Sequence, residues 1–219
     1  WRPIDDCYQL LNTGLPRWPL HDSLALLMTT SGSTGSPKLV RLSKQNLESN
    51  AASIAQYLGL TAEERGLVSL PINYVYGLSI INSHLSVGAT LLLTGKSVMQ
   101  RELWNFVREE RASSFAGVPY TYEILKKLRF MRMDLPDLRT LTQAGGKLSA
   151  ALQQEFTEYA EQSGKQFIVM YGAAEATSRM AWLAPQDAST RYGSIGKPIP
   201  GGEFMLLDSD DKPITTPGV

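Results

Sequence analysis

The stretch TSGSTGSPK, residues 30–38, is the most informative part of this chain because it combines glycine, serine and threonine with a terminal lysine. Glycine lets a backbone approach a ligand closely, and successive peptide N–H groups in such a loop form a concave surface that binds anions. The hydroxyl groups supply further donors, and Lys38 supplies a positive charge. The stretch therefore predicts a loop that wraps a polyphosphate, with an ordinary turn after a strand at residues 24–28 as the alternative.

The spacing within this stretch argues against the phosphate-binding loop of P-loop phosphotransferases. That loop follows the pattern G-x-x-x-x-G-K-[ST]. Gly32, Gly35 and Lys38 have a different spacing. In addition, Pro37 precedes the lysine, and Leu39 stands where the magnesium-binding hydroxyl is required. A P-loop phosphotransferase is therefore disfavoured.

The composition around the stretch is that of a globular protein, with 219 residues of which 43% are hydrophobic and 19% are charged. Lys and Arg together number 21, as do Asp and Glu, so the formal net charge is zero. This balance gives no electrostatic reason to expect a nucleic acid or a membrane as partner. No apolar run approaches the length of a membrane span, and no signal peptide is visible. A polyphosphate would have to be bound by a local site.

The single cysteine, Cys7, excludes an internal disulfide and is typical of the reducing cytoplasm, where we expect the protein to reside. The chain begins without a methionine and stops after a proline–glycine pair. We therefore expect it to be a fragment of a longer protein.

Short apolar runs alternate with amphipathic segments along most of the chain. Helices are predicted after Ser43, Ser97 and Ser149 and over residues 77–87 and 120–128. Strands are predicted at residues 24–28, 67–70, 89–94, 113–116, 138–143 and 167–170. Alternating strands and helices predict an α/β fold with largely parallel sheet layers flanked by helices.

Three parts of the chain are expected from this pattern. Residues 1–22 form an irregular N-terminal segment, residues 23–178 form the α/β core, and residues 179–219 begin a truncated β-rich subdomain. The last part is rich in glycine and proline and contains strand-like pieces at residues 180–183 and 203–207.

Three polar or glycine-rich segments follow predicted strands: residues 30–38, 143–147 and 171–175. Ligands of open parallel sheets bind outside the carboxyl ends of the strands. In the second segment, Gly145 and Gly146 would let a flat ring press on bare backbone, although a tight turn is the alternative. In the third, Tyr171 could stack on a purine and Glu175 could hold Mg²⁺ beside phosphates, with a core tyrosine and a solvated glutamate as the alternative.

Taken in this order, the segments resemble the adenylate-forming (AMP-binding) superfamily, and most closely its acyl-CoA synthetase-like members, as an internal fragment of their large N-terminal domain. The resemblance covers nearly the whole chain. Besides the first loop, the stretches that carry it are LPINYVYGL (residues 70–78), FAGVPYTYEIL (115–125), LTQAGGKLS (141–149), YGAAEAT (171–177) and GSIGKPIPGG (193–202).

The resemblance implies a role for each of these segments. It implies that Lys38 and Glu175 are catalytic and that Glu175 binds Mg²⁺. It implies that an acyl pocket is lined by Tyr74, Gly117, Val118 and Pro119. The implied ATP-binding residues are Thr30, Ser31, Gly32, Ser33, Thr34, Gly35, Lys38, Gly145, Gly146, Tyr171, Gly172 and Ala174.

The implied reaction is the activation of a small carboxylic acid. Its carboxylate attacks the α-phosphorus of ATP, pyrophosphate leaves, and the resulting acyl-adenylate is passed to the thiol of coenzyme A or to the phosphopantetheine thiol of an acyl carrier protein. No side chain has to act as a covalent nucleophile, which agrees with the absence of a convincing Ser-His-Asp or Cys-His set. His21 and His84 are expected to be structural.

Ala174 departs from the family pattern, in which a threonine or serine precedes the motif glutamate and contacts the α-phosphate. A lost hydrogen bond to a charged group costs about 1.5–3 kcal/mol, or roughly ten- to a hundredfold in rate. Ala174 is therefore expected to weaken the site without silencing it. The alternative is a degenerate relative that binds nucleotide without turnover. Because the family's ribose-binding aspartate motif and late catalytic lysine are missing here, the chain alone is expected to be inactive.

Overall fold

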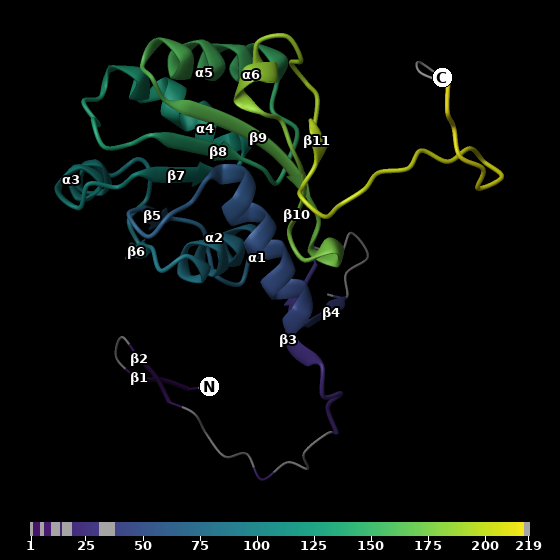
Figure 1. Ribbon diagram of the computed structural model, residues 1–219. Helices are drawn as coiled ribbons and strands as arrows, with labels where there is room; N and C mark the ends of the chain where they lie inside the picture. Colours follow the sequence, from purple (N-terminus) through teal and green to yellow (C-terminus); the bar gives the residue numbers. More distant parts are fainter. Residues whose placement is uncertain (1, 5–6, 10–13, 15–18, 31–37, 217–219) are drawn as a thin grey trace.

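A computed structural model describes residues 2–4, 7–9, 14, 19–30 and 38–216 of the chain. Residues 31–37, which hold most of the predicted phosphate loop, lie outside the described residues. Within the described part, the largest sheet has seven strands in the order β11-β10-β9-β8-β7-β5-β6. Figure 1 shows this sheet at the centre of the molecule. Its strands are β5 (Arg65–Val68), β6 (Thr90–Leu93), β7 (Ser114–Gly117), β8 (Thr140–Gln143), β9 (Gln166–Gly172), β10 (Arg179–Trp182) and β11 (Lys197–Pro198).

The strands from β5 to β9 pair in parallel, whereas β10 and β11 add antiparallel strands at one edge. Helices cover both faces, with α4 and α5 on one face and α1 and α2 on the other (Figure 1). This arrangement confirms the predicted α/β fold with a mostly parallel sheet. The helices are α1 (Lys44–Leu58), α2 (Val75–Ser86), α3 (Arg101–Glu109), α4 (Pro119–Lys127), α5 (Ala150–Gln162) and α6 (Pro185–Ala188), with short 3₁₀ helices η1 (Phe130–Arg132) and η2 (Ala174–Ala176).

Successive side chains of the central strands enter two different apolar clusters. In β5, Leu67 packs with residues of α3, α4 and α5, whereas its neighbour Val68 packs with residues of α2. Phe115 and Ala116 of β7 divide in the same way. Because strand side chains alternate between faces, a continuous apolar run is what a sheet covered on both sides requires.

The ends of two helices lie where the sequence predicted them. At the start of α1, the Ser43 hydroxyl accepts a hydrogen bond from the Asn46 N–H (3.1 Å), and Asn46 Oδ1 accepts one from the Ser43 N–H (3.0 Å). The helix ends at Gly59, which adopts φ 61°. Ser149 caps α5 by accepting from the Leu152 N–H at 3.3 Å.

Two predictions of local structure were wrong. Ser97 does not begin a helix: the Gln100 N–H donates to the Ser97 carbonyl (2.9 Å) in a turn, and α3 starts after that turn with Gln100 as its N-cap residue. Residues 203–207 form no strand; an isolated bridge joins Leu207 to Pro213 there. The Asp208 carboxylate accepts from the Asp210 and Lys212 N–H groups and so stabilises the turn instead.

The predicted strand at residues 24–28 is confirmed as β3 (Leu24–Thr29), but it does not join the parallel sheet. It pairs antiparallel with β4 (Leu39–Ser43), a strand that the sequence analysis missed. Parallel pairing needs a crossover of about a dozen residues or more, and residues 30–38 are too few for one. A second hairpin pairs β1 (Arg2–Ile4) with β2 (Cys7–Gln9). Across the described residues, we find no helix with the length and apolar character to cross a membrane.

Candidate functional site

The loops that follow β5, β7, β8 and β9 meet at one edge of the sheet, since these strands are parallel. The register aligns the strand ends: Gly117 pairs with Gln143, and Gln143 pairs with Val169. The segments that follow these positions carry most of the predicted site residues that the structure describes. Their common edge is where open parallel sheets bind ligands.

The predicted acyl-pocket residues touch the predicted adenine-flanking glycines. A β-carbon added at Gly145 would overlap the hydroxyl oxygen of Tyr74 and lie 3.2 Å from Val118 Cγ1. One added at Gly146 would lie 3.1 Å from Pro119 Cγ. Gly145 also has φ +80°, a conformation that favours glycine. The two predicted subsites are therefore adjacent, and both glycines serve their close approach.

Tyr74 and Gly117 shape this cluster further. Burial raises the pKa of the Tyr74 hydroxyl, which therefore stays protonated as a hydrogen-bond donor at neutral pH. At Gly117, an added β-carbon would lie 2.9 Å from Thr121 Cγ2 and 3.0 Å from Tyr122 Cε2. A larger residue at this strand end would push against the first turns of α4.

A cavity of about 510 Å³ lies beside this cluster. Gly145, Gly146, Tyr171 and Gly172 contribute to its wall, so the second and third predicted segments share one cavity. Tyr171 is 45% exposed. Binding pockets for small molecules have volumes of roughly 300–1,000 Å³. An aromatic face together with bare backbone in a cavity of this size suits a flat heterocycle.

A second cavity of about 400 Å³ contains the exposed Glu175. Arg41 and Leu42 of β4 line it as well, so the strand that begins just after Lys38 reaches the same cavity as the predicted magnesium ligand. Ala174 is half-buried in the same short helix η2, directly before Glu175. The two cavities are lined by residues close in sequence, since Gly172 of the first cavity directly precedes the segment that contains Glu175 of the second.

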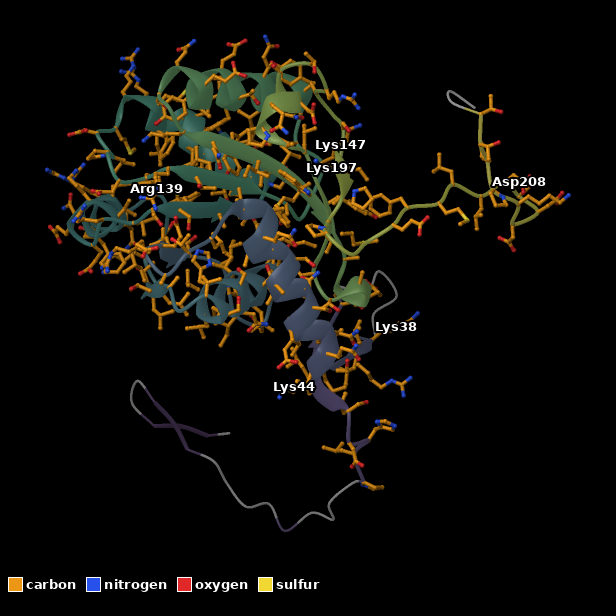
Figure 2. The ribbon with its side chains drawn as sticks, viewed as in Figure 1. Lys38, Lys44, Arg139, Lys147, Lys197 and Asp208 are labelled. Carbon is orange, nitrogen blue, oxygen red and sulfur yellow. The ribbon has the colours of Figure 1, made fainter. Side chains whose placement is uncertain are left out.

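The ends of the predicted phosphate loop are held by the β3–β4 hairpin. The Thr30 N–H donates to the Lys38 carbonyl at 3.0 Å, just beyond the last strand pair. Lys38 itself is exposed. Figure 2 shows Lys38 near β4, at the hairpin end of the molecule, and Lys147 on the side of β11. Ser31, Gly32, Ser33, Thr34 and Gly35 lie outside the described residues.

The donor set around Glu175 is compatible with Mg²⁺ but not with an all-protein metal cage. Among the described residues, no three or more His, Cys, Asp or Glu side chains form a group that could hold a metal. Magnesium is usually bound through one or two carboxylates, with phosphate oxygens and water completing its shell. A single carboxylate such as that of Glu175, in a cavity that β4 also lines, fits that pattern.

Arg179 is a residue whose place no sequence signal indicated. It is 3% exposed, its Nε donates to Ser79 Oγ (3.2 Å) and its Nη1 donates to Tyr57 Oη (3.2 Å). The guanidinium also lies 5.1 Å from the ring centre of Tyr76, whose hydroxyl is 2.8 Å from Thr142 Oγ1. Burial raises the pKa of Tyr57 and of Tyr76, more than the nearby arginine lowers them. Arg179 thus fixes the start of β10 against α1 and α2.

Comparison with known proteins shows to which family the chain belongs. Among curated proteins, a 2-succinylbenzoate–CoA ligase from Bacillus pumilus is 31% identical over 185 residues, which cover 84% of this chain and 36% of that protein. A feruloyl-CoA synthase from an Amycolatopsis species is 31% identical over 195 residues, covering 88% of this chain and 39% of that protein. The chain therefore spans little more than a third of the length of these relatives.

Among solved structures, the O-succinylbenzoate coenzyme A synthetase of Bacillus subtilis in complex with AMP has a TM-score of 0.77 and 26% identity, over 88% of this chain and 38% of that chain. The same relative in complex with ATP and a magnesium ion has a TM-score of 0.75, over 86% of this chain and 38% of that chain. The family model described as AMP-binding enzyme matches residues 5–219. Because this match extends along almost its whole length, the chain belongs to the AMP-binding enzyme family.

Proposed function

We propose that the protein activates a small carboxylic acid with ATP, releasing pyrophosphate and forming an acyl-adenylate, and then passes the acyl group to the thiol of coenzyme A. The observation that carries the proposal is the contact cluster at the sheet edge, where Tyr74 and Val118 meet Gly145 beside the cavity that contains Tyr171. This arrangement offers neighbouring places for an acid and for the adenosine part of ATP, which would bring the carboxylate near the α-phosphorus that it attacks.

The base is proposed to lie in the larger cavity. The ring of Tyr171 offers an aromatic face, and the backbone at Gly145 and Gly146 offers a flat surface without side chains. Gly172 lines the same cavity, and an added β-carbon there would overlap the Ser178 carbonyl, so the close approach of β9 to the start of β10 requires glycine. In such a slot, aromatic stacking and apolar contacts can bind a purine without a charged side chain.

The phosphates are proposed to lie between η2 and the hairpin loop. Lys38, the Thr30 backbone and the loop Ser31, Gly32, Ser33, Thr34 and Gly35 would supply positive charge and oriented N–H and O–H donors. Donors fixed in advance stabilise negative charge that develops during the reaction, without reorganisation at that moment. The Thr30–Lys38 hydrogen bond holds the two ends of this loop together.

Glu175 is proposed to hold Mg²⁺ against the phosphates. When bound, the metal ion neutralises charge on the leaving pyrophosphate. The residues themselves would orient the reactants: Glu175 would fix one side of the phosphate chain from η2, and Lys38, directly before β4, would fix the other. Ala174 contributes no hydroxyl, so one donor toward the α-phosphate is missing from this arrangement.

The acid is proposed to bind between Tyr74 and the segment Gly117, Val118 and Pro119. The half-buried Tyr74 hydroxyl can donate a hydrogen bond to a carboxylate oxygen. The same hydroxyl fills the space beside Gly145, and we propose a compact acid as the substrate and not a long acyl chain. The curated relatives compared above are named as CoA ligases, which supports coenzyme A as the acceptor. A carrier-protein phosphopantetheine thiol is the alternative acceptor.

The test is a pyrophosphate-release assay on the full-length protein with ATP, Mg²⁺ and a panel of small carboxylic acids, with the acyl-adenylate detected by mass spectrometry. Adding coenzyme A or a phosphopantetheinylated carrier protein then identifies the acceptor. Glu175→Gln should lower the rate by about tenfold or more. Glu109→Gln, an exposed glutamate on α3, is the matched control and should leave the rate unchanged. Nucleotide binding without pyrophosphate release from any acid would overturn the ligase proposal in favour of a degenerate binding protein.

A further inference from the structure

Arg179, the first residue of β10, carries a buried positive charge that no acidic side chain balances. It is 3% exposed, and among the described residues no Asp or Glu forms an ion pair with it. Its side-chain partners are neutral: Ser79 Oγ, Tyr57 Oη and Met170 Sδ. Burying a charge without an ionic partner is costly. Packing alone therefore does not explain an arginine at this position.

The partners of Arg179 come from three different elements. Ser79 lies on α2, Tyr57 on α1 and Met170 on β9. The main chain is held as well, because Asn50 Nδ2 on α1 donates to the Arg179 carbonyl at 2.9 Å. The planar guanidinium group donates in several fixed directions at once, which suits it to link separate elements. Arg179 therefore ties the start of β10 to α1, α2 and β9.

The segment that carries Glu175 runs from Gly172 to Arg179, which face each other in the β9–β10 pairing. A β-carbon at Gly172 would overlap the Ser178 carbonyl and lie 3.0 Å from the Arg179 Cα, so the two ends of the segment are in close contact. At the second end, the Ser178 hydroxyl also donates to the Val75 carbonyl of α2 (3.4 Å). The position of Arg179 thus sets where the segment ends.

The interior of this segment is closed by its own main chain. Three hydrogen bonds join N–H groups to carbonyl groups within it: Ala176 to Ala173 (3.2 Å), Thr177 to Ala174 (3.1 Å) and Ser178 to Ala176 (2.9 Å). Thr177 also adopts φ +74°, which is rare for a β-branched residue and persists only where the surrounding structure holds it. Because these turns leave little slack, a displacement at Arg179 would be passed on to Glu175.

We propose that Arg179 is a positioning residue for Glu175: it anchors the end of the segment and so holds the Glu175 carboxylate where it can bind Mg²⁺ against the phosphates of ATP. This proposal rests on the proposed function in taking Glu175 as the magnesium ligand. Asn50, which bonds the Arg179 carbonyl, lines the same cavity as Glu175, so the anchor adjoins the site that the carboxylate serves. Residues that orient a metal ligand typically change metal affinity by about ten- to a hundredfold when they are replaced.

An Arg179→Met variant separates this role from a contribution to stability. Methionine keeps much of the apolar stem but removes the charge and the hydrogen bonds to Ser79 and Tyr57. Replacing buried ionic groups by apolar side chains is often neutral or stabilising, so the variant is expected to fold. Arg65→Met is the matched control, because Arg65 bonds only Glu110 and lies at the amino end of β5, opposite the strand ends that form the candidate site.

The experiment measures the affinity of the full-length protein for ATP by titration calorimetry, once with Mg²⁺ and once with EDTA in its place. The ratio of the two affinities reports the contribution of the metal ion, and a partial loss of folded protein cancels in it. Arg179→Met should lower this ratio by about tenfold or more, whereas Arg65→Met should leave it unchanged. Arg179→Lys, which keeps the charge but not the planar group, should give an intermediate ratio.

A double-variant cycle with Glu175→Gln tests whether Arg179 acts through Glu175. In the Glu175→Gln background, Arg179→Met should lower the ratio no further, because the carboxylate that Arg179 positions is absent. A general structural role of Arg179 would instead give independent, additive effects.

The outcomes distinguish this proposal from the proposed function. An unchanged ratio in Arg179→Met, or additive effects in the cycle, would overturn the positioning role alone. Equal affinities with and without Mg²⁺ in the unsubstituted protein would overturn Glu175 as the magnesium ligand, and the positioning role with it. Magnesium-dependent ATP binding that responds to Arg179→Met, without pyrophosphate release from any acid, would overturn the ligase proposal and support the positioning role.

Discussion

The hydroxyl group of Tyr74 occupies the space beside Gly145 that a β-carbon at that position would need. This contact joins the loop after β5 to the loop after β8, two strands that are separated in the sheet by β7. Gly145 also has φ +80°. The position therefore requires glycine for two separate reasons, backbone conformation and close approach.

Gly145→Ala should destabilise the protein and weaken ATP binding, because it adds strain and pushes Tyr74 aside. Gly88→Ala is the matched control, since Gly88 has φ +74° but open space around it. Left-handed backbone costs a non-glycine residue about 1–2 kcal/mol, and Gly145→Ala should exceed the control by a similar amount. Urea unfolding of both variants measures this. Adding Tyr74→Phe to Gly145→Ala should recover part of the difference, and a fully additive double variant would contradict the contact.

Ala174→Thr should raise kcat/KM of the full-length protein by about ten- to a hundredfold, because it restores a hydroxyl that can donate toward the α-phosphate. Steady-state pyrophosphate release measures the effect. Ala174→Val has nearly the same shape without the hydroxyl and should give no gain. An equal gain from valine would show that packing of η2, and not a hydrogen bond, limits the site.

His84 should make stability depend on pH. Its side chain is buried on α2, with Nδ1 2.8 Å from the Ile80 carbonyl and Nε2 3.4 Å from Ser114 Oγ. Burial lowers the pKa of this imidazole below its ordinary value of about 6.5, a shift that Arg179 reinforces and that the Ile80 carbonyl and Glu64 oppose. The folded protein thus favours the neutral ring.

Because the unfolded chain binds this proton more readily, the contribution of His84 to stability is fully present above pH 6.5 and is lost as pH falls through the lowered folded-state pKa. The slope is limited to about 1.4 kcal/mol per pH unit for one proton. Urea unfolding between pH 7.5 and 5 measures it. His84→Gln should flatten this part of the profile, whereas His21→Gln, at an exposed position, should leave it as it was. A profile unchanged by His84→Gln would refute the assignment.

Ser43→Ala should destabilise the protein by about 1 kcal/mol because it removes the side-chain half of the capping box at the start of α1. Ser49→Ala changes the same residue type inside the same helix, where alanine is the better helix former, and should be neutral or slightly stabilising. Thermal unfolding of the two variants compares them. Equal melting temperatures would show that the cap contributes nothing measurable.

Local chemistry made part of the fold predictable. Serine at a helix start and glycine at its end predicted the ends of α1, and apolar runs predicted the central strands. Ser97 misled because its hydroxyl and carbonyl stabilise a turn that precedes α3, and the helix itself starts at Arg101. Strand β4 was missed because its five-residue sequence, LVRLS, is too short to show a clear strand pattern. Its pairing with β3 makes it a strand.

The sequence by itself determined the phosphate-loop composition, the glycines at strand ends and the family motifs, because these depend on neighbours along the chain. Only the tertiary structure decided that Gln153 bonds the backbone of a distant loop, and that Arg179 is buried against α1 and α2. The physical reason is that each of these states depends on a backbone or side-chain group from a different element. The partner of Gln153 is the N–H of Gly193, beyond β9 and β10, and the partners of Arg179 are Tyr57 and Ser79. Such pairings follow from strand order and register, which no local pattern encodes.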